Sequence, residues 1–302
     1  TNRQHAQARV VGSVDLGDGN DTYIGGSGTD TYDLSGTNAN ATVNLVTGTA
    51  SSAETGSDTL SNVENVIGSN GINTITGTSG ANRIEGRGGN DIINGGGGGD
   101  TLLGGAGNDQ ISGGLGADLI VGGAGSDRID LGNPLANNRD VARLTATGDY
   151  GDEVFDFRST GNGGQRDVLS QAGTLNNAFD DVANDNQMQF ALGSNAIFAQ
   201  IVSLDTVEAL YLSGAAGQGV TNANLDDALQ VANAFNSKFW VFSNGANQDA
   251  VLVINDTDGN DCTVWQYQES GAQSGIQGAE LTLMARLHSN STVTTGQFIF
   301  EQ

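Results

Sequence analysis

Residues 86–130 read GRGGNDIIN, GGGGGDTLL, GGAGNDQIS, GGLGADLIV and GGAGSDRID, five consecutive units of nine residues with glycine first and aspartate sixth. Two looser units, GSNGINTIT and GTSGANRIE, precede them over residues 68–85. The eighth place is apolar in all seven units, as Ile75, Ile84, Ile93, Leu102, Ile111, Ile120 and Ile129. Apolar residues in phase at a fixed period indicate stacked repeats and exclude a flexible Gly/Asn-rich linker.

Each unit divides into a turn of six residues and a strand of three. Glycine in the turn allows backbone angles and close approaches that a Cβ would forbid. Turn carbonyls and the sixth-place carboxylate offer hard oxygen ligands, which suit Ca²⁺ and would be poor for Zn²⁺. We predict two units per coil, so that units n and n+2 stack at about 4.8 Å with ions between their turns. The predicted roll ligands are Asp91, Asp100, Asp109, Asp118 and Asp127, together with backbone carbonyls.

The two looser units carry Asn73 and Asn82 at the sixth place, so we expect a degenerate start of the roll without ions. A shorter run upstream, residues 16–33, reads LGDGNDTYI and GGSGTDTYD and adds Asp21 and Asp30 as predicted calcium ligands. Two units cannot bury a core alone. We therefore expect the pair to pack on the segment that follows or on sequence before the first residue.

These motifs resemble the RTX, or hemolysin-type calcium-binding, proteins that type I secretion exports. Residues Ala41–Asn70, with the core DTLSNVENVIG, also resemble the lead-in that often precedes such rolls. The resemblance implies several bound Ca²⁺ ions and a secreted protein of a Gram-negative-type bacterium, associated with the cell surface. It also implies the type I secretion machinery as a partner.

Charge and composition support this interpretation. Among 302 residues, 11 Lys and Arg face 35 Asp and Glu, which gives a net charge of −24. This excess opposes compaction until a cation neutralises it, so we expect a chain that is unfolded at cytosolic calcium and folded outside the cell. No basic stripe exists, so we expect no nucleic-acid partner. The single cysteine, Cys262, excludes an internal disulfide, and without an apolar stretch of about 18 residues we expect no transmembrane segment.

The predicted fold is mainly β: a calcium-binding parallel β-roll, then a β-rich domain, then a small α+β domain. In the β-rich part, VARLTA, EVFDF, MQFAL, AIFAQIVSL and ALYLS are candidate strands, and the acidic Asp152, Glu153 and Asp156 fit a solvated strand face. The predicted segments are 1–34 (short repeat pair), 35–67 (lead-in), 68–133 (roll), 134–220 (β-rich cap) and 221–302 (α+β domain with a type I secretion signal).

The C-terminal segment starts with a predicted helix over Thr221–Phe235, followed by a meander of strands at KFWVFSNG, DAVLVIND, CTVWQY, AELTLMARL and GQFIFEQ. This order resembles the secretion-signal-bearing domain of large RTX surface proteins, including bacterial S-layer proteins. Its acidic loop has two interpretations, a calcium site with Asp256, Asp258 and Asn260 or a plain hairpin loop. An EF-hand is excluded because Tyr267 holds the twelfth place.

No catalytic constellation is visible. The two histidines, His5 and His288, lie in different regions, and neither H-E-x-x-H nor G-x-S-x-G occurs. We therefore expect a protein that is not an enzyme.

Three functions fit the sequence. The first is a structural or assembly protein of the bacterial cell exterior, an S-layer, matrix or adhesin subunit. Its partners would be other copies of itself in a lattice or filament, and cell-surface polysaccharide. The second is the secretion and folding module of an RTX exoenzyme (protease, lipase or epimerase) whose catalytic domain is absent from this sequence. The third is a carbohydrate-binding module in the β-rich region, although its aromatic residues mostly follow the strand pattern of a core.

Overall fold

The fold is known from a computed structural model that describes residues 3–5, 19–132, 138–145, 151–157, 168–172, 190–193, 209–212, 249–255, 261–268, 281–289 and 298–301. Every regular element within these ranges is a strand, which confirms the mainly β prediction. The chain divides into two compact units, Thr1–Arg143 with Thr147–Asp149, and Leu144–Ala146 with Tyr150–Gln302. The predicted helix over 221–235 and the strands predicted at AIFAQIVSL and KFWVFSNG lie outside the described residues.

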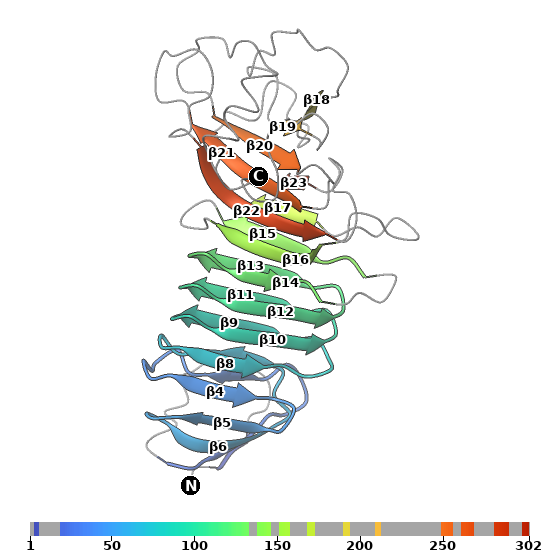
Figure 1. The fold of residues 1–302 in the computed structure, drawn as a ribbon. Helices are drawn as coiled ribbons and strands as arrows, with labels where there is room; N and C mark the ends of the chain where they lie inside the picture. Colours follow the sequence, from blue (N-terminus) through green and yellow to red (C-terminus); the bar gives the residue numbers. More distant parts are fainter. Residues whose placement is uncertain are drawn as a thin grey trace. The chain divides into compact units, whose positions relative to one another are not determined.

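The nonapeptides form a parallel β-roll in which successive strands alternate between two sheets (Figure 1). The strands are β8 (Asn73–Thr76), β9 (Arg83–Gly88), β10 (Ile92–Gly97), β11 (Thr101–Ala106), β12 (Gln110–Leu115), β13 (Leu119–Ala124), β14 (Arg128–Asp130) and β15 (Val141–Thr145). One sheet has the order β8-β10-β12-β14 and the other β9-β11-β13-β15. Ile93 lies opposite Ile111 and Leu102 opposite Ile120. This register confirms the prediction of two units per coil.

The core of the roll is the column of eighth-place side chains. Each of the seven is at most 2% exposed, and both sheets contribute to the column. Neighbouring side chains in a strand point to opposite faces, so Ile93 is 1% exposed while Ile92 beside it is 48% exposed. Each short strand therefore contributes one large apolar side chain to the core.

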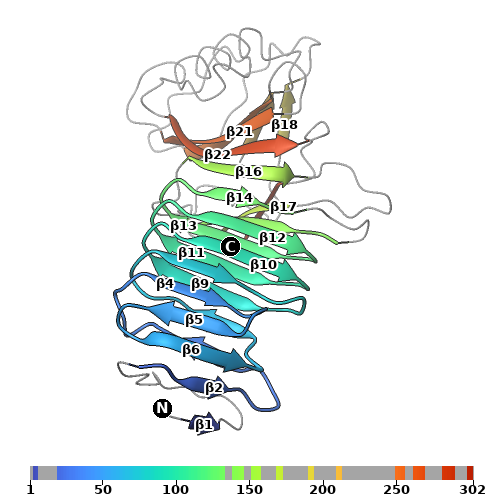
Figure 2. The same cartoon turned by 60° about the horizontal axis from the view of Figure 1, so that its bottom comes forward.

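The roll continues toward the N-terminus through the repeat pair and the lead-in. The strands here are β1 (Arg3–His5), β2 (Thr22–Ile24), β3 (Thr31–Asp33), β4 (Ala41–Asn44), β5 (Thr49–Ser52), β6 (Gly56–Ser61) and β7 (Asn65–Ile67). β2 pairs in parallel with β6 and β3 with β7, so the repeat pair packs on the segment that follows it. The strands β4, β5 and β6 form an antiparallel insertion, seen side by side in Figure 2.

This insertion makes the two sheets unequal. Three strands separate β2 from β8 in one sheet, whereas only β7 separates β3 from β9 in the other. At this level the interior is filled by Tyr23 and Tyr32, each 1% exposed, in place of isoleucine. Their rings meet edge to face, with centroids 6.1 Å apart and planes at 74°. The tyrosines at the apolar place thus belong to the core.

The second unit has strands in the order β16 (Asp152–Phe157), β22 (Leu281–Ser289), β21 (Asp261–Gln268), β20 (Asp249–Asn255), β19 (Ala209–Leu212) and β18 (Phe190–Gly193). The predicted meander is present, since β20, β21 and β22 pair antiparallel. A further pair joins β17 (Val168–Ala172), which was not predicted, to β23 (Phe298–Glu301).

The acidic residues of β16 and the only cysteine, in β21, differ in exposure from residue to residue. Glu153 is exposed, but Asp152 is 0% exposed, so the prediction of a solvated strand face is wrong for Asp152. The two residues are neighbours in one strand and point to opposite faces. In β21, Cys262 is fully buried, next to Thr263, whose Oγ1 accepts a hydrogen bond from Trp265 Nε1 at 2.9 Å.

The adjacent isoleucines of β10 provide a matched test of the core. We expect Ile93→Ala to lower the free energy of unfolding by roughly 2–5 kcal/mol, because it leaves a cavity in the column. Ile92→Ala should cost less than about 1 kcal/mol, because that side chain is half exposed. Urea unfolding in millimolar calcium, followed by circular dichroism, compares the two. Equal losses would contradict the assignment of the core face.

Candidate calcium-binding turns

A ladder of hydrogen bonds joins the turns of successive coils. The backbone N–H of each sixth-place residue from Asn73 to Asp118 donates to a carboxylate oxygen of the aspartate one coil further along. Asp91 N lies 2.7 Å from Asp109 Oδ1, Asp100 N lies 2.8 Å from Asp118 Oδ1, and Asp109 N lies 2.7 Å from Asp127 Oδ1. Because two units make one coil, the aspartates form two columns. All five predicted roll ligands therefore lie in equivalent positions.

The second oxygen of these carboxylates is left open. In Asp91, Asp100, Asp109 and Asp118, Oδ2 is buried and accepts no hydrogen bond. Each of these residues is at most 2% exposed. A buried charged oxygen without a partner is costly, so the turns require a cation or a proton. Hard, anionic oxygens fit Ca²⁺.

The first-place glycine keeps space beside that open oxygen. A Cβ on Gly104 would lie 2.2 Å from Asp109 Oδ2 and 2.4 Å from the carbonyl oxygen of Gly122, one coil further along. The glycines at places two and four serve the backbone instead, as the φ angles of Gly105 (117°) and Gly107 (130°) show. Among the described residues no group of three or more His, Cys, Asp or Glu could hold a metal. Backbone carbonyls would therefore complete the ligand set.

The asparagine turns at the start of the roll have the opposite polarity. Asn73 Nδ2 donates to the carbonyl oxygens of Gly71 at 2.7 Å and Gly86 at 3.1 Å. Asn82 Nδ2 donates to the carbonyl oxygen of Glu64 at 2.6 Å. An amide N–H thus bonds to oxygens that would otherwise face a cation. This supports the expectation that these two turns hold no ion.

Burial opposes ionisation of the ladder carboxylates. It raises the pKa of Asp91 to about 6, and those of Asp100 and Asp109 to about 7, from an ordinary value of 3.8. The charge of Asp118 adds to the effect on Asp100, and the charges of Asp127 and Asp91 add to the effect on Asp109. Burial also raises the pKa of Asp118. A bound cation would remove this penalty.

One buried carboxylate of the ladder was missed by sequence reasoning. Asp118 N donates to Asp140 Oδ1 at 2.9 Å, and Asp140 is 2% exposed. The spacing here is 22 residues, whereas the other ladder bonds span 18, because an insertion containing Pro134 interrupts the period. The fully buried Ala142 takes the apolar place. Asp140, Val141 and Ala142 have the same Asp-x-apolar order as places six to eight of a nonapeptide, and this order could have revealed Asp140 as a ladder carboxylate.

Two further missed carboxylates lie in the lead-in. Asp21 N donates to Asp58 Oδ1 and Asp30 N donates to Glu64 Oε2, both at 2.9 Å. Asp21 is half-buried and Asp30 is buried. Asp58 and Glu64 occur outside any nonapeptide, so periodicity could not reveal them. The remaining candidates, Asp256, Asp258 and Asn260, lie outside the described residues.

The two-sheet stack and its oxygen-rich turns define a parallel β-roll of the calcium-binding class. A family model for the RTX calcium-binding nonapeptide repeat matches residues 13–32, 67–102 and 103–133, in 4 copies. These residues therefore carry RTX-type calcium-binding repeats. RTX repeats bind calcium, and proteins that carry them are typically secreted. A search of curated proteins finds no match. Within the described part of the chain, no helix is long and apolar enough to span a membrane.

The central aspartate of one column is the most informative substitution. Asp109→Asn keeps an acceptor for Asp91 N–H but removes a buried charge, as Asn73 does naturally. We expect calcium binding to weaken about tenfold or more, since affinity follows ligand charge. The ion-free roll should become more stable, because burial of the carboxylate no longer opposes folding. Calorimetric calcium titration and the β structure measured by circular dichroism in EGTA report the two effects, and a variant with unchanged calcium binding would contradict the site.

Calcium binding should also depend on pH. The folded, ion-free roll holds protons on Asp91, Asp100 and Asp109 up to about pH 6–7, whereas the unfolded chain releases them near 3.8. Stability in EGTA should therefore fall as pH rises from 4 to 7. Apparent calcium affinity should rise as pH increases through 6–7, because calcium competes with protons. Circular dichroism in EGTA between pH 4 and 7 tests the first sign, and calcium titrations between pH 5.5 and 8.5 test the second. A flat affinity profile would contradict the expectation.

Proposed function

We propose that the chain is a secreted calcium-binding structural protein of the bacterial cell exterior, an S-layer, matrix or adhesin subunit that folds and assembles on calcium. The observation that carries this proposal is the row of buried, open Oδ2 atoms in the two aspartate columns. Such turns require a cation or, at lower pH, a proton. The role is not catalytic.

Calcium supplies the folding switch. Extracellular calcium modules bind with dissociation constants of about 10⁻⁴–10⁻³ M, a range that suits the medium outside a cell. At lower calcium the buried carboxylates repel one another, and their desolvation opposes folding. The chain would then pass through the type I secretion machinery unfolded and fold outside.

Assembly follows from the same charge balance. With a net charge of −24, copies repel one another until divalent cations neutralise them. Neutralised copies can pack against one another, against polysaccharide, or through bridging calcium. The resemblance of the C-terminal segment to S-layer and other large RTX surface proteins supports a lattice or filament.

The test is the state of the purified chain in EGTA, in millimolar magnesium and in millimolar calcium. We expect expanded monomers in EGTA and magnesium. In calcium we expect compaction followed by sheets or filaments that EGTA dissolves. Light scattering and electron microscopy read out size and order.

A charge-matched pair of variants provides the control. The double substitution Asp100→Asn/Asp118→Asn should weaken calcium-driven compaction and assembly, because both residues belong to one ladder column and lose the charges that bind the ion. Asp33→Asn/Asp130→Asn changes the net charge equally but leaves the columns intact, since these residues bond to the N–H groups of Ser35 and Gly132. Compact monomers of the unsubstituted chain at millimolar calcium would contradict assembly and favour the folding module of an RTX exoenzyme.

A further inference from the structure

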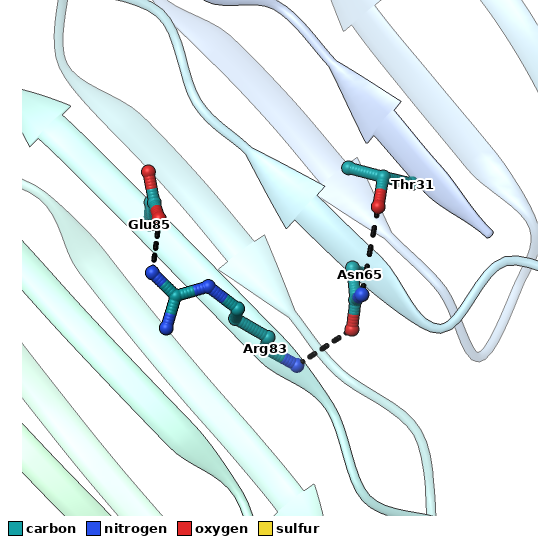
Figure 3. Close-up of polar contacts among 4 residues, drawn as sticks. All are labelled: Thr31, Asn65, Arg83 and Glu85. Carbon is teal, nitrogen blue, oxygen red and sulfur yellow. Dashed lines mark hydrogen bonds and ion pairs between the residues drawn. The ribbon is translucent and has the colours of Figure 1, made fainter. Parts of the chain in front are cut away.

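The lead-in contributes one turn to a column of the roll. In the sheet that contains β3, β7 and β9, Thr31 lies opposite Asn65, and Asn65 opposite Arg83. Figure 3 shows the bonds between them: Asn65 Nδ2 to Thr31 Oγ1 at 3.5 Å, and Arg83 N to Asn65 Oδ1 at 2.9 Å. Asp30 and Glu64 immediately precede Thr31 and Asn65. They therefore lie one coil apart at equivalent positions of the column.

Glu64 makes the bond that a repeat aspartate makes elsewhere. Asp30 N donates to Glu64 Oε2 at 2.9 Å, as Asp100 N donates to Asp118 Oδ1 at 2.8 Å. The lead-in turn is shorter than a nonapeptide turn. The longer glutamate side chain thus takes the place of the sixth-place aspartate.

The turn above Glu64 keeps an open carboxylate oxygen. Asp30 is 1% exposed, and its Oδ1 is buried and accepts no hydrogen bond. Its other oxygen accepts the N–H of Gly26 at 2.8 Å. A Cβ on Gly25 would lie 1.7 Å from the carbonyl oxygen of Asn62. The first-place glycine thus faces a carbonyl of the next coil, as Gly104 does within the roll.

The other carboxylate of the lead-in differs. Asp58 Oδ1 accepts the N–H of Asp21 at 2.9 Å, and Asp58 Oδ2 accepts the hydroxyl of Tyr32 at 2.7 Å. Both oxygens of Asp58 are therefore bonded to protein donors. Glu64 is therefore the lead-in carboxylate that is bonded to a residue, Asp30, whose Oδ1 is buried without a hydrogen bond.

We propose that a Ca²⁺ ion binds between the turn Gly25–Asp30 and the lead-in turn Asn62–Glu64, with Glu64 as a carboxylate ligand in place of a repeat aspartate. Asp30 and backbone carbonyls supply the remaining protein oxygens. This ion joins the N-terminal repeat pair to the lead-in, in addition to the pairing of β3 with β7. The site requires calcium binding by the chain, and it does not depend on assembly.

The first test is calorimetric titration of the full chain with calcium. Glu64→Gln keeps an oxygen acceptor for Asp30 N–H but removes the charge. We expect this variant to bind one Ca²⁺ fewer, or to bind that ion about tenfold more weakly, while the other ions bind as before. The matched control is Glu54→Gln, an exposed lead-in glutamate that accepts the N–H of Asn38 at 3.3 Å. It should bind calcium as the unsubstituted chain does.

A second readout locates the missing ion. Tyr23 lies near the site, and after burial itself the charges of Asp30 and Glu64 raise its pKa further. Tb³⁺ in this site should therefore emit when tyrosine is excited. Glu64→Gln, Asp30→Asn and Tyr23→Phe should each lower this emission, and Glu54→Gln should not.

Two results would overturn the proposal: an unchanged ion count with unchanged affinities in Glu64→Gln, or equal losses in Glu64→Gln and Glu54→Gln. In either case calcium-driven assembly of the unsubstituted chain would still support the proposed function. A chain that binds calcium and stays monomeric, but loses one ion in Glu64→Gln, would support the site and contradict assembly. An unsubstituted chain without calcium binding would overturn both.

Discussion

The roll depends on buried sixth-place carboxylates, such as those of Asp109 and Asp118, that have only one oxygen bonded to the protein. That oxygen accepts the backbone N–H of the previous coil and holds adjacent turns in register. The other faces a space that a glycine keeps open. The isoleucine column alone is thin, since each strand buries one large side chain. Cohesion of the roll is therefore divided between a permanent apolar core and turns that need a cation.

The sequence predicts the regular part well because its signals are local. A period of nine specifies which side chain enters the core, which residue turns the chain and which carboxylate enters the ladder, as Ile111 and Asp109 illustrate. The carboxylates at Asp58, Glu64 and Asp140 escape prediction because their positions result from pairing between distant strands. Strand β17 escapes because VLSQA alternates weakly. No pattern of nine can report an insertion such as β4–β6.

The first coils of the roll replace ionic contacts by neutral ones. Where the ladder has Asn73 and Asn82, amide groups donate to carbonyl oxygens, and where it has Asp58, the hydroxyl of Tyr32 closes the remaining oxygen. In these coils the protein itself supplies the hydrogen-bond partner. The chain thus combines two kinds of coil. In some coils the protein itself supplies the hydrogen-bond partners of the buried polar groups, and in others the buried carboxylates need a cation or a proton from the medium.

The ladder has a direction. In each link from Asn73 to Asp118 the donor belongs to an earlier residue than the acceptor, and the link from Asp118 reaches Asp140, beyond the regular repeats. Loss of a coil from the N-terminal side removes donors and leaves each remaining link complete. Loss from the C-terminal side leaves a buried N–H with no acceptor. In a polypeptide made from its N-terminus, each turn therefore gains its carboxylate acceptor only when the coil that follows it has been made.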